Sequence, residues 1–168
     1  MTRLNDFNEV LNGRKSVKVF DSEYKIPHEE MDEMIQKATK APSSVNMQPW
    51  RIMVVDSDEG KEKILPSFGM NSRQVNTLSA MIIVFGDLKN YEKAEQIYND
   101  AVDQAHMTEE IKTQMLEWIL PYYKSLSREG MKDIVNIDSS LMAMQFMLVA
   151  KSHGYDTNPI GGFDKANI

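Results

Sequence analysis

Three basic side chains lie close together near the start of an otherwise acidic chain. Arg14, Lys15 and Lys18 surround the hydroxyl group of Ser16. If this segment is extended, Arg14, Ser16 and Lys18 project from one face, where guanidinium, hydroxyl and ammonium donors could together hold a phosphate group. A solvated basic turn is the alternative interpretation, because short basic runs commonly lie at the surface. The segment therefore indicates an anion site without identifying the ligand.

A second stretch, residues 41–50, reads Ala-Pro-Ser-Ser-Val-Asn-Met-Gln-Pro-Trp. Pro42 and Pro49 restrict the backbone at its two ends. Backbone amides and the Ser and Asn side chains could therefore be presented to a flat ligand at little entropic cost. Alternatively, the stretch only ends a helix, and Trp50 anchors the next element in the core. The spacing leaves both interpretations open.

A third stretch, residues 154–164, reads Gly-Tyr-Asp-Thr-Asn-Pro-Ile-Gly-Gly-Phe-Asp. Taken in order, the three stretches resemble the nitroreductase family, whose members carry an Arg-basic-Ser segment, a Pro-Ser-Ser-x-Asn-x-Gln-Pro-Trp loop and a Pro-Ile-x-Gly turn. The resemblance extends from about Asn5 to Ile168. It implies an α+β, nitroreductase-like fold with a central, mostly antiparallel sheet flanked by helices, in a homodimer with FMN at the interface.

The resemblance also implies which residues bind the FMN cofactor. Arg14, Lys15 and Ser16 would hold its phosphate and ribityl chain, and Lys18 would lie near the pyrimidine edge of the ring or the incoming nicotinamide. The other subunit would contribute a loop that contains Pro42, Ser43, Ser44 and Asn46. No metal ligands are implied.

The isoalloxazine ring would lie against a turn, one of whose backbone N–H groups would donate to flavin N5. This turn consists of Pro159, Ile160, Gly161 and Gly162. Glycine suits the position because a side chain would obstruct close approach of the backbone to the ring. Asn71 resembles the family residue at the ring edge. Gln74 stands where some members place a lysine, so Lys18 is expected to stabilise the reduced flavin instead.

By the same resemblance, the chain is expected to be an NAD(P)H-dependent FMN oxidoreductase with a ping-pong mechanism. A small oxidised acceptor, such as a nitroaromatic or a quinone, would take the electrons. The flavin carries the difficult chemistry, so no catalytic side chain is expected. The sequence does not distinguish NADH from NADPH. Two alternatives stay open: a flavin-binding or regulatory protein with little turnover, and a helical interaction domain.

Hydrophobic periodicity predicts the elements that position these residues. The first half of the chain is expected to contain a short helix, a strand, an amphipathic helix and two buried strands: Asp6–Asn12, Ser16–Phe20, His28–Lys40, Arg51–Val55 and Met81–Phe85. Helical patterns follow over Tyr91–Leu126, where Pro121 is expected to kink or break the helix, and over Ile134–Lys151. Helices dominate, so an α+β domain is favoured over a doubly wound one.

Composition narrows the function classes further. Acidic residues outnumber basic ones 25 to 19 among 168 residues, so no broad positive field for nucleic acid or anionic lipid is expected. The chain contains 0 cysteines and shows no export signal or membrane segment, which suits a cytoplasmic protein. The histidines His28, His106 and His153 are interpreted as surface or helix-end residues, and most of the 13 methionines as core packing.

The length predicts one domain over residues 1–168. Against the family pattern, this domain lacks the C-terminal strand and the tail that embraces the partner subunit. Because residues 162–168 resemble the start of a further helix, a longer polypeptide is the preferred explanation.

Overall fold

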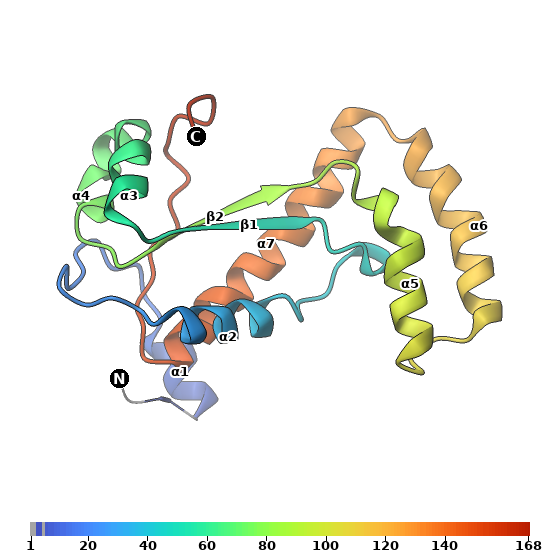
Figure 1. The fold of residues 1–168 in the computed structure, drawn as a ribbon, viewed down its shortest axis with the longest axis horizontal. Coiled ribbons are helices and arrows are strands. Elements are labelled where there is room, and N and C mark those ends of the chain that lie inside the picture. Colours follow the sequence, from blue (N-terminus) through green and yellow to red (C-terminus); the bar gives the residue numbers. More distant parts are fainter. Residues whose placement is uncertain (1–2, 5) are drawn as a thin grey trace. The chain divides into compact units, whose positions relative to one another are not determined.

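A computed structural model describes residues 3–4 and 6–168; Asn5, where the family resemblance begins, lies outside the described residues. Figure 1 shows that helices make up most of the described chain. In order, the elements are α1 (Phe7–Gly13), α2 (His28–Ala38), η1 (Ser44–Asn46), β1 (Trp50–Val55), α3 (Asp58–Ile64), η2 (Leu65–Asn71), α4 (Ser72–Val75), β2 (Met81–Gly86), η3 (Asn90–Lys93), α5 (Ala94–Asp103), α6 (Glu109–Ser125) and α7 (Arg128–Ser152).

The described chain divides into two compact units. The first contains the described residues up to Lys40 together with Ile52–Ile83 and Ala143–Ile168. The second contains Ala41–Arg51 and Val84–Met142. The strands β1 and β2 and the helix α7 contribute residues to both units.

The strands β1 and β2 form a two-stranded antiparallel sheet, which confirms the strands predicted at Arg51–Val55 and Met81–Phe85. Both are short apolar runs rich in β-branched residues, which favour an extended, half-buried backbone. Where β2 ends, the amide of Asp87 donates to the carbonyl oxygen of Pro49, just before β1 begins, at 2.8 Å. The described chain is helix-rich with a small antiparallel sheet, which confirms the α+β class.

The strand predicted at Ser16–Phe20 is wrong. Only Ser16 pairs, in an isolated parallel bridge with Thr157. Side chains take the place of a neighbouring strand: Asn158 Nδ2 donates to the Val17 carbonyl oxygen at 3.0 Å, and the Phe20 amide donates to Thr77 Oγ1 at 3.1 Å. The alternating pattern therefore produced an extended segment that satisfies its backbone without a ladder.

In the first unit, α2 packs on the C-terminal end of α7. The amphipathic helix was predicted at His28–Lys40, and its apolar residues Met31 and Met34 pack with Ala150 and Tyr155. The helix α7 starts earlier than the predicted Ile134 and ends before Gly154, whose φ of 91° fits the position after a helix C-terminus.

In the second unit, α5, α6 and the first part of α7 share one apolar cluster, which also includes Met47. Its buried members are Met47, Ala94, Tyr98, Ile119, Tyr123, Met131 and Val135. Pro121 was expected to kink or break the helix; the break is wrong, because α6 continues through Pro121 to Ser125. Pro121 is exposed, so water can satisfy the carbonyl group that loses its helical donor.

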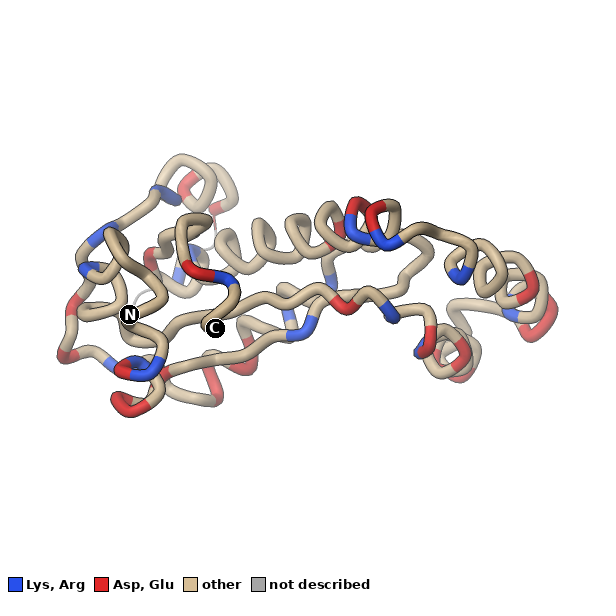
Figure 2. Tube along the Cα trace, turned by 90° about the horizontal axis from the view of Figure 1, so that it is seen from above, with Lys and Arg blue, Asp and Glu red and all other residues tan. Residues whose placement is uncertain are grey.

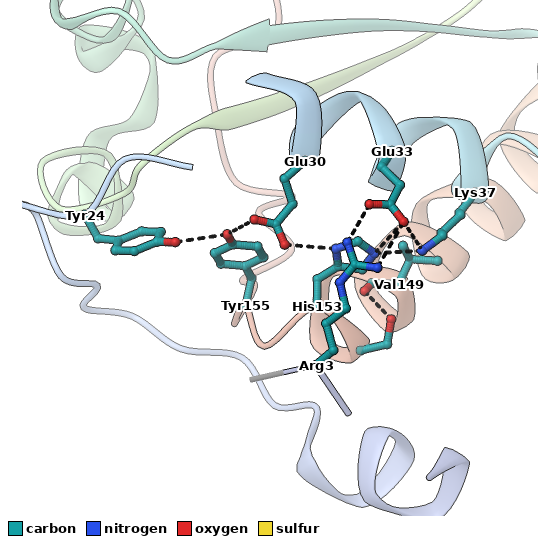
Figure 3. Close-up of polar contacts among 9 residues, drawn as sticks. Arg3, Tyr24, Glu30, Glu33, Lys37, Val149, His153 and Tyr155 are labelled. Atoms are coloured by element: carbon teal, nitrogen blue, oxygen red, sulfur yellow. Dashed lines mark hydrogen bonds and ion pairs between the residues drawn. The ribbon is translucent and has the colours of Figure 1, made fainter. Parts of the chain in front are cut away.

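A network of polar side chains joins α2 to the residues that follow α7 (Figure 3). His153 is at a helix end, as predicted, but only 1% of it is exposed. Its Nδ1 lies 3.1 Å from Glu30 Oε1 and its Nε2 lies 2.9 Å from Lys37 Nζ. Tyr155, two residues on, donates to Glu30 Oε2 at 2.6 Å. The network fixes the turn that leads into residues 157–162.

Acidic and basic residues are interspersed along the described chain (Figure 2). No cluster of three or more metal-ligating side chains is found among the described residues. Over the same residues, no helix has the length and apolar character needed to cross a membrane.

Candidate functional site

The basic segment near the N-terminus is joined directly to the turn after α7. Ser16 forms the parallel bridge with Thr157, and the Val17 amide donates to the Thr157 carbonyl oxygen at 3.1 Å. The Asn158 side chain returns a hydrogen bond to the Val17 carbonyl group. Two segments about 140 positions apart in the sequence are thereby held side by side.

The polar side chains on this segment are available to a ligand. Arg14 is half-buried, whereas Lys15, Ser16 and Lys18 are exposed. Within residues 3–4 and 6–168, no ion pair involves any of the three cations. Thr157 Oγ1, beside them, is buried and has no hydrogen-bond partner in the described part of the chain. Cations that form no ion pair, next to a hydroxyl group that has no hydrogen-bond partner among the described residues, fit an anionic, oxygen-rich ligand.

The glycine turn is held by Asn71, which precedes α4. Asn71 Nδ2 donates to the Gly162 carbonyl oxygen at 2.8 Å, and Gln74 Nε2 donates to Asn71 Oδ1 at 3.1 Å. Gln74 is buried, so its hydrogen bond fixes the orientation of the Asn71 side-chain amide. A Cβ atom at Gly162 would lie 3.4 Å from Asn71 Nδ2, whereas Gly161 has open space on that side. The turn can therefore approach a flat ring closely.

Aromatic stacking anchors the far side of the same turn. The rings of Phe68 and Phe163 stack with centroids 5.6 Å apart, and Phe68 is buried. The Asp164 amide donates to the Ser67 carbonyl oxygen at 2.8 Å. The segment after Gly162 is thus held against η2, which ends at Asn71.

In the second unit, the proline-bounded loop has an unusual backbone. Val45, Asn46 and Gln48 have φ values of 45°, 59° and 44°, in the left-handed region that residues other than glycine rarely adopt. Ser43 Oγ accepts from the Gln48 amide at 3.0 Å. Strained backbone of this kind is concentrated at functional sites.

The structure brings together the predicted site residues that belong to the first unit: Arg14, Lys15, Ser16, Lys18, Asn71, Gln74, Pro159, Ile160, Gly161 and Gly162. The others form one loop in the second unit: Pro42, Ser43, Ser44 and Asn46. Contact of these residues with FMN stays a prediction.

Sequence reasoning missed three residues of these sites. Thr157 and Asn158 join the turn to the basic segment, and Asp138 lies beneath the Ser43–Gln48 loop. The only available signal for Asp138 was a lone carboxylate within an apolar helical run.

Fold and site together define an α+β protein in which a basic segment is bridged to a glycine turn held by Asn71. The family model for the nitroreductase family matches residues 11–168. The chain therefore belongs to the nitroreductase family, a family of oxidoreductases, as the three motifs indicated.

Named relatives cover nearly the whole chain. "Putative NAD(P)H nitroreductase YdgI" of Bacillus subtilis is 46% identical over 100% of this chain and 80% of its own length. The crystal structure of a "putative NAD(P)H:FMN oxidoreductase" from Staphylococcus epidermidis is 80% identical, with a TM-score of 0.97 over 99% of this chain and 78% of that one. A "putative nitroreductase in complex with FMN" from Exiguobacterium sibiricum is 46% identical, with a TM-score of 0.97 over 99% and 80% of the two chains.

Proposed function

We propose that this protein binds FMN and transfers electrons from NADH or NADPH to a small oxidised acceptor, such as a nitroaromatic or a quinone. The observation that carries the proposal is the bridge between the basic segment, whose cations form no ion pair with the described residues, and the glycine turn held by Asn71. Solved relatives support the cofactor, because one is named an NAD(P)H:FMN oxidoreductase and another is a complex with FMN.

Each part of the site has a role in binding. Arg14, Lys15 and Ser16 offer charge-assisted and neutral donors to the phosphate and ribityl oxygens. Lys18 is two residues farther along the same extended segment and supplies a positive charge near the ring. Bound FMN would accept a hydride from the nicotinamide and pass electrons to the acceptor in a ping-pong sequence.

The turn contributes shape and backbone donors rather than acid–base chemistry. Pro159, Ile160, Gly161 and Gly162 would lie against the isoalloxazine ring. Asn71 fixes the Gly162 carbonyl group, so the peptide groups of this turn are oriented before the ligand arrives. Preorganised donors of this kind cost little reorganisation when the ring changes its charge.

A homodimer is part of the same proposal. On α7, the large apolar residues Ile137, Leu141 and Met144 recur at a spacing of four and three and are 62%, 45% and 40% exposed. This spacing places them on one face of the helix. A contiguous exposed apolar stripe is typical of an interface, and a second copy of the chain would cover it. Pro42, Ser43, Ser44 and Asn46 would then reach the flavin of the partner subunit.

We also propose that the protein is located in the cytoplasm, because reduced nicotinamide cofactors are supplied there.

The acceptor is proposed by its chemical class only. The "CLA biosynthesis enone reductase" of Lactiplantibacillus plantarum is 35% identical over 95% of this chain and 74% of its own length, so enones should be tested as acceptors as well.

Steady-state kinetics test this proposal. Protein reconstituted with FMN should oxidise NADH or NADPH only when a quinone, nitroaromatic or enone is added. Double-reciprocal plots at several acceptor concentrations should give parallel lines, as a ping-pong cycle requires. Apoprotein without FMN is the control and should be inactive. Tight FMN binding without turnover on any of the three acceptor classes would instead favour a flavin-binding protein with a regulatory role.

A further inference from the structure

Asp138 is a buried carboxylate on α7, with only 2% of the residue exposed. Residues one turn away on either side, Ile134 and Met142, are apolar. No Lys, Arg or His of the described residues forms an ion pair with Asp138. A buried charge without a cation is unfavourable unless hydrogen bonds compensate for its lost hydration.

Both oxygens of Asp138 are bonded to a single loop residue. The Ser44 amide donates to Oδ2 at 3.0 Å, and the Ser44 hydroxyl donates to Oδ1 at 3.2 Å. Ser44 is the first residue of η1, so this two-point contact fixes the loop where its unusual backbone begins. The Ser44 O–H group therefore donates to Asp138 and is not available to another acceptor.

The left-handed residues follow immediately. Val45 is β-branched and therefore poorly suited to its φ of 45°, and Asn46 and Gln48 share that region of backbone conformation. Such a conformation persists only where the surroundings enforce it. Tyr98 assists by donating to the Val45 carbonyl oxygen at 2.9 Å. Burial raises the pKa of Tyr98 from its ordinary value of 10 to about 12, still further above neutral pH, where the hydroxyl is a donor.

The loop presents Asn46 outward. Its side chain is exposed, and Gln48 Nε2 donates to Asn46 Oδ1 at 3.2 Å. Asn46 Nδ2 has no acceptor in the described part of the chain and is left as a donor. The amide therefore has a defined orientation without a ligand.

We propose that Asp138 is a positioning residue for the flavin: by clamping Ser44, it holds the Ser43–Gln48 loop in the left-handed form that presents Asn46 to FMN. This inference rests on the FMN-binding function proposed above. Asp138 itself stays beneath the loop and does not touch the ligand. Ser44 acts chiefly by placing the backbone rather than as a donor to FMN.

Two variants test the clamp, with a matched control on the same helix. Asp138→Asn keeps the size of the side chain but replaces one acceptor oxygen with a donor group. Ser44→Ala removes only the hydroxyl contact and, at an exposed position, should leave folding intact. Asp133→Asn removes the same charge from an exposed position on α7 and is the control.

Hydrogen exchange at residues 43–48 in the apoprotein and equilibrium titration with FMN are the two measurements. Exchange should accelerate and FMN affinity should fall about 10-fold for Asp138→Asn and by less for Ser44→Ala, while Asp133→Asn matches the wild type. In the double variant, the losses of affinity should be clearly less than additive, because both changes break one clamp. A general loss of stability would not produce this coupling.

Unchanged exchange at the loop in both variants would overturn the clamp. Faster exchange with unchanged FMN affinity would overturn its role toward the flavin. Should Asp138→Asn fail to fold, additional measurements on Ser44→Ala decide, and unchanged affinity there overturns the proposal. Failure of the wild-type protein to bind FMN is a separate result, which refutes the proposed function and with it the role of the clamp.

Discussion

Asn71 and Gly162 are 91 positions apart in the sequence, and the Asn71 side-chain amide donates to the Gly162 carbonyl oxygen at 2.8 Å. This contact joins the end of η2 to the turn after α7. The bridge between Ser16 and Thr157 joins the same turn to the basic segment. The turn is therefore the centre of the candidate site, because each predicted group of the first unit is attached to it.

Arg14→Ala is expected to weaken FMN binding by roughly 1.5–3 kcal/mol, the range for a charge-assisted hydrogen bond, without unfolding the protein. Equilibrium titration of FMN into apoprotein measures the change. Arg128→Ala, which removes an exposed arginine at the start of α7, should bind like the wild type. Equal FMN affinities for Arg14→Ala and the wild type would favour the alternative interpretation of the basic segment as a solvated turn.

Gln74→Lys is expected to raise the midpoint potential of bound FMN, because a nearby positive charge stabilises the reduced, anionic ring. The added ammonium can also replace the Gln74 amide as donor to Asn71. A shift of about 30–60 mV follows for a charge interaction of roughly 1.4–2.8 kcal/mol in a two-electron couple. Potentiometric titration with a reference dye measures it. Gln74→Met controls for size, and a potential no higher in the lysine variant than in the methionine variant contradicts the prediction.

Leu141→Glu is expected to disrupt the proposed dimer and give a monomer, because it places a charge in the exposed apolar stripe of α7. FMN affinity should fall with it, since the loop containing Ser43 and Asn46 would no longer reach the partner's flavin. Light scattering after size-exclusion chromatography reports the mass. Gln114→Glu at an exposed position of α6 is the control. A dimeric Leu141→Glu protein would place the interface elsewhere.

Stability is expected to depend on pH through Glu33. Hydrogen bonds from Lys37 and then Arg3 lower the pKa of Glu33 from 4.5 to about 2. A lowered pKa in the folded state means that the contribution is complete above the unfolded value and is lost as pH falls through the folded value. Glu33→Gln should therefore destabilise the protein at neutral pH, and the difference should shrink between pH 4.5 and about 2.

Urea unfolding at several pH values measures this difference. Because Glu33 is partly exposed, added salt should reduce it as well. Glu62→Gln, an exposed carboxylate of α3, serves as the control and should change little at any pH. A difference for Glu33→Gln that does not depend on pH contradicts the ion-pair explanation.

The elements with strong periodicity could be predicted from the sequence. The helix α2 and the strands β1 and β2 were expected because their apolar residues repeat with the periods of helix and strand. The extended segment at Ser16–Phe20 was misread as a strand, because alternation does not reveal whether a neighbouring strand or side chains such as Asn158 satisfy the backbone.

The motifs of the candidate site could be predicted from the sequence, but the contacts between them could not. Arg14 and the glycine turn were found by residue type and by family resemblance. Their attachment through Thr157 depends on long-range packing that no local pattern encodes. His153 was correctly expected at a helix end, but its burial could not be predicted, because its partners Glu30 and Lys37 lie on a distant helix. These contacts were missed because each joins polar groups that are far apart in the sequence.

The central claim is that this protein holds FMN as an electron carrier between a nicotinamide and an acceptor. Anaerobic spectrophotometry tests it most directly: the protein is reconstituted with FMN and separately with FAD, and NADH or NADPH is then added. We expect tight binding of FMN but not of FAD, loss of the visible flavin absorption when the nicotinamide is added, and its return when a quinone follows. Protein that binds no FMN, prefers FAD, or keeps its oxidised spectrum with both nicotinamides would contradict the claim.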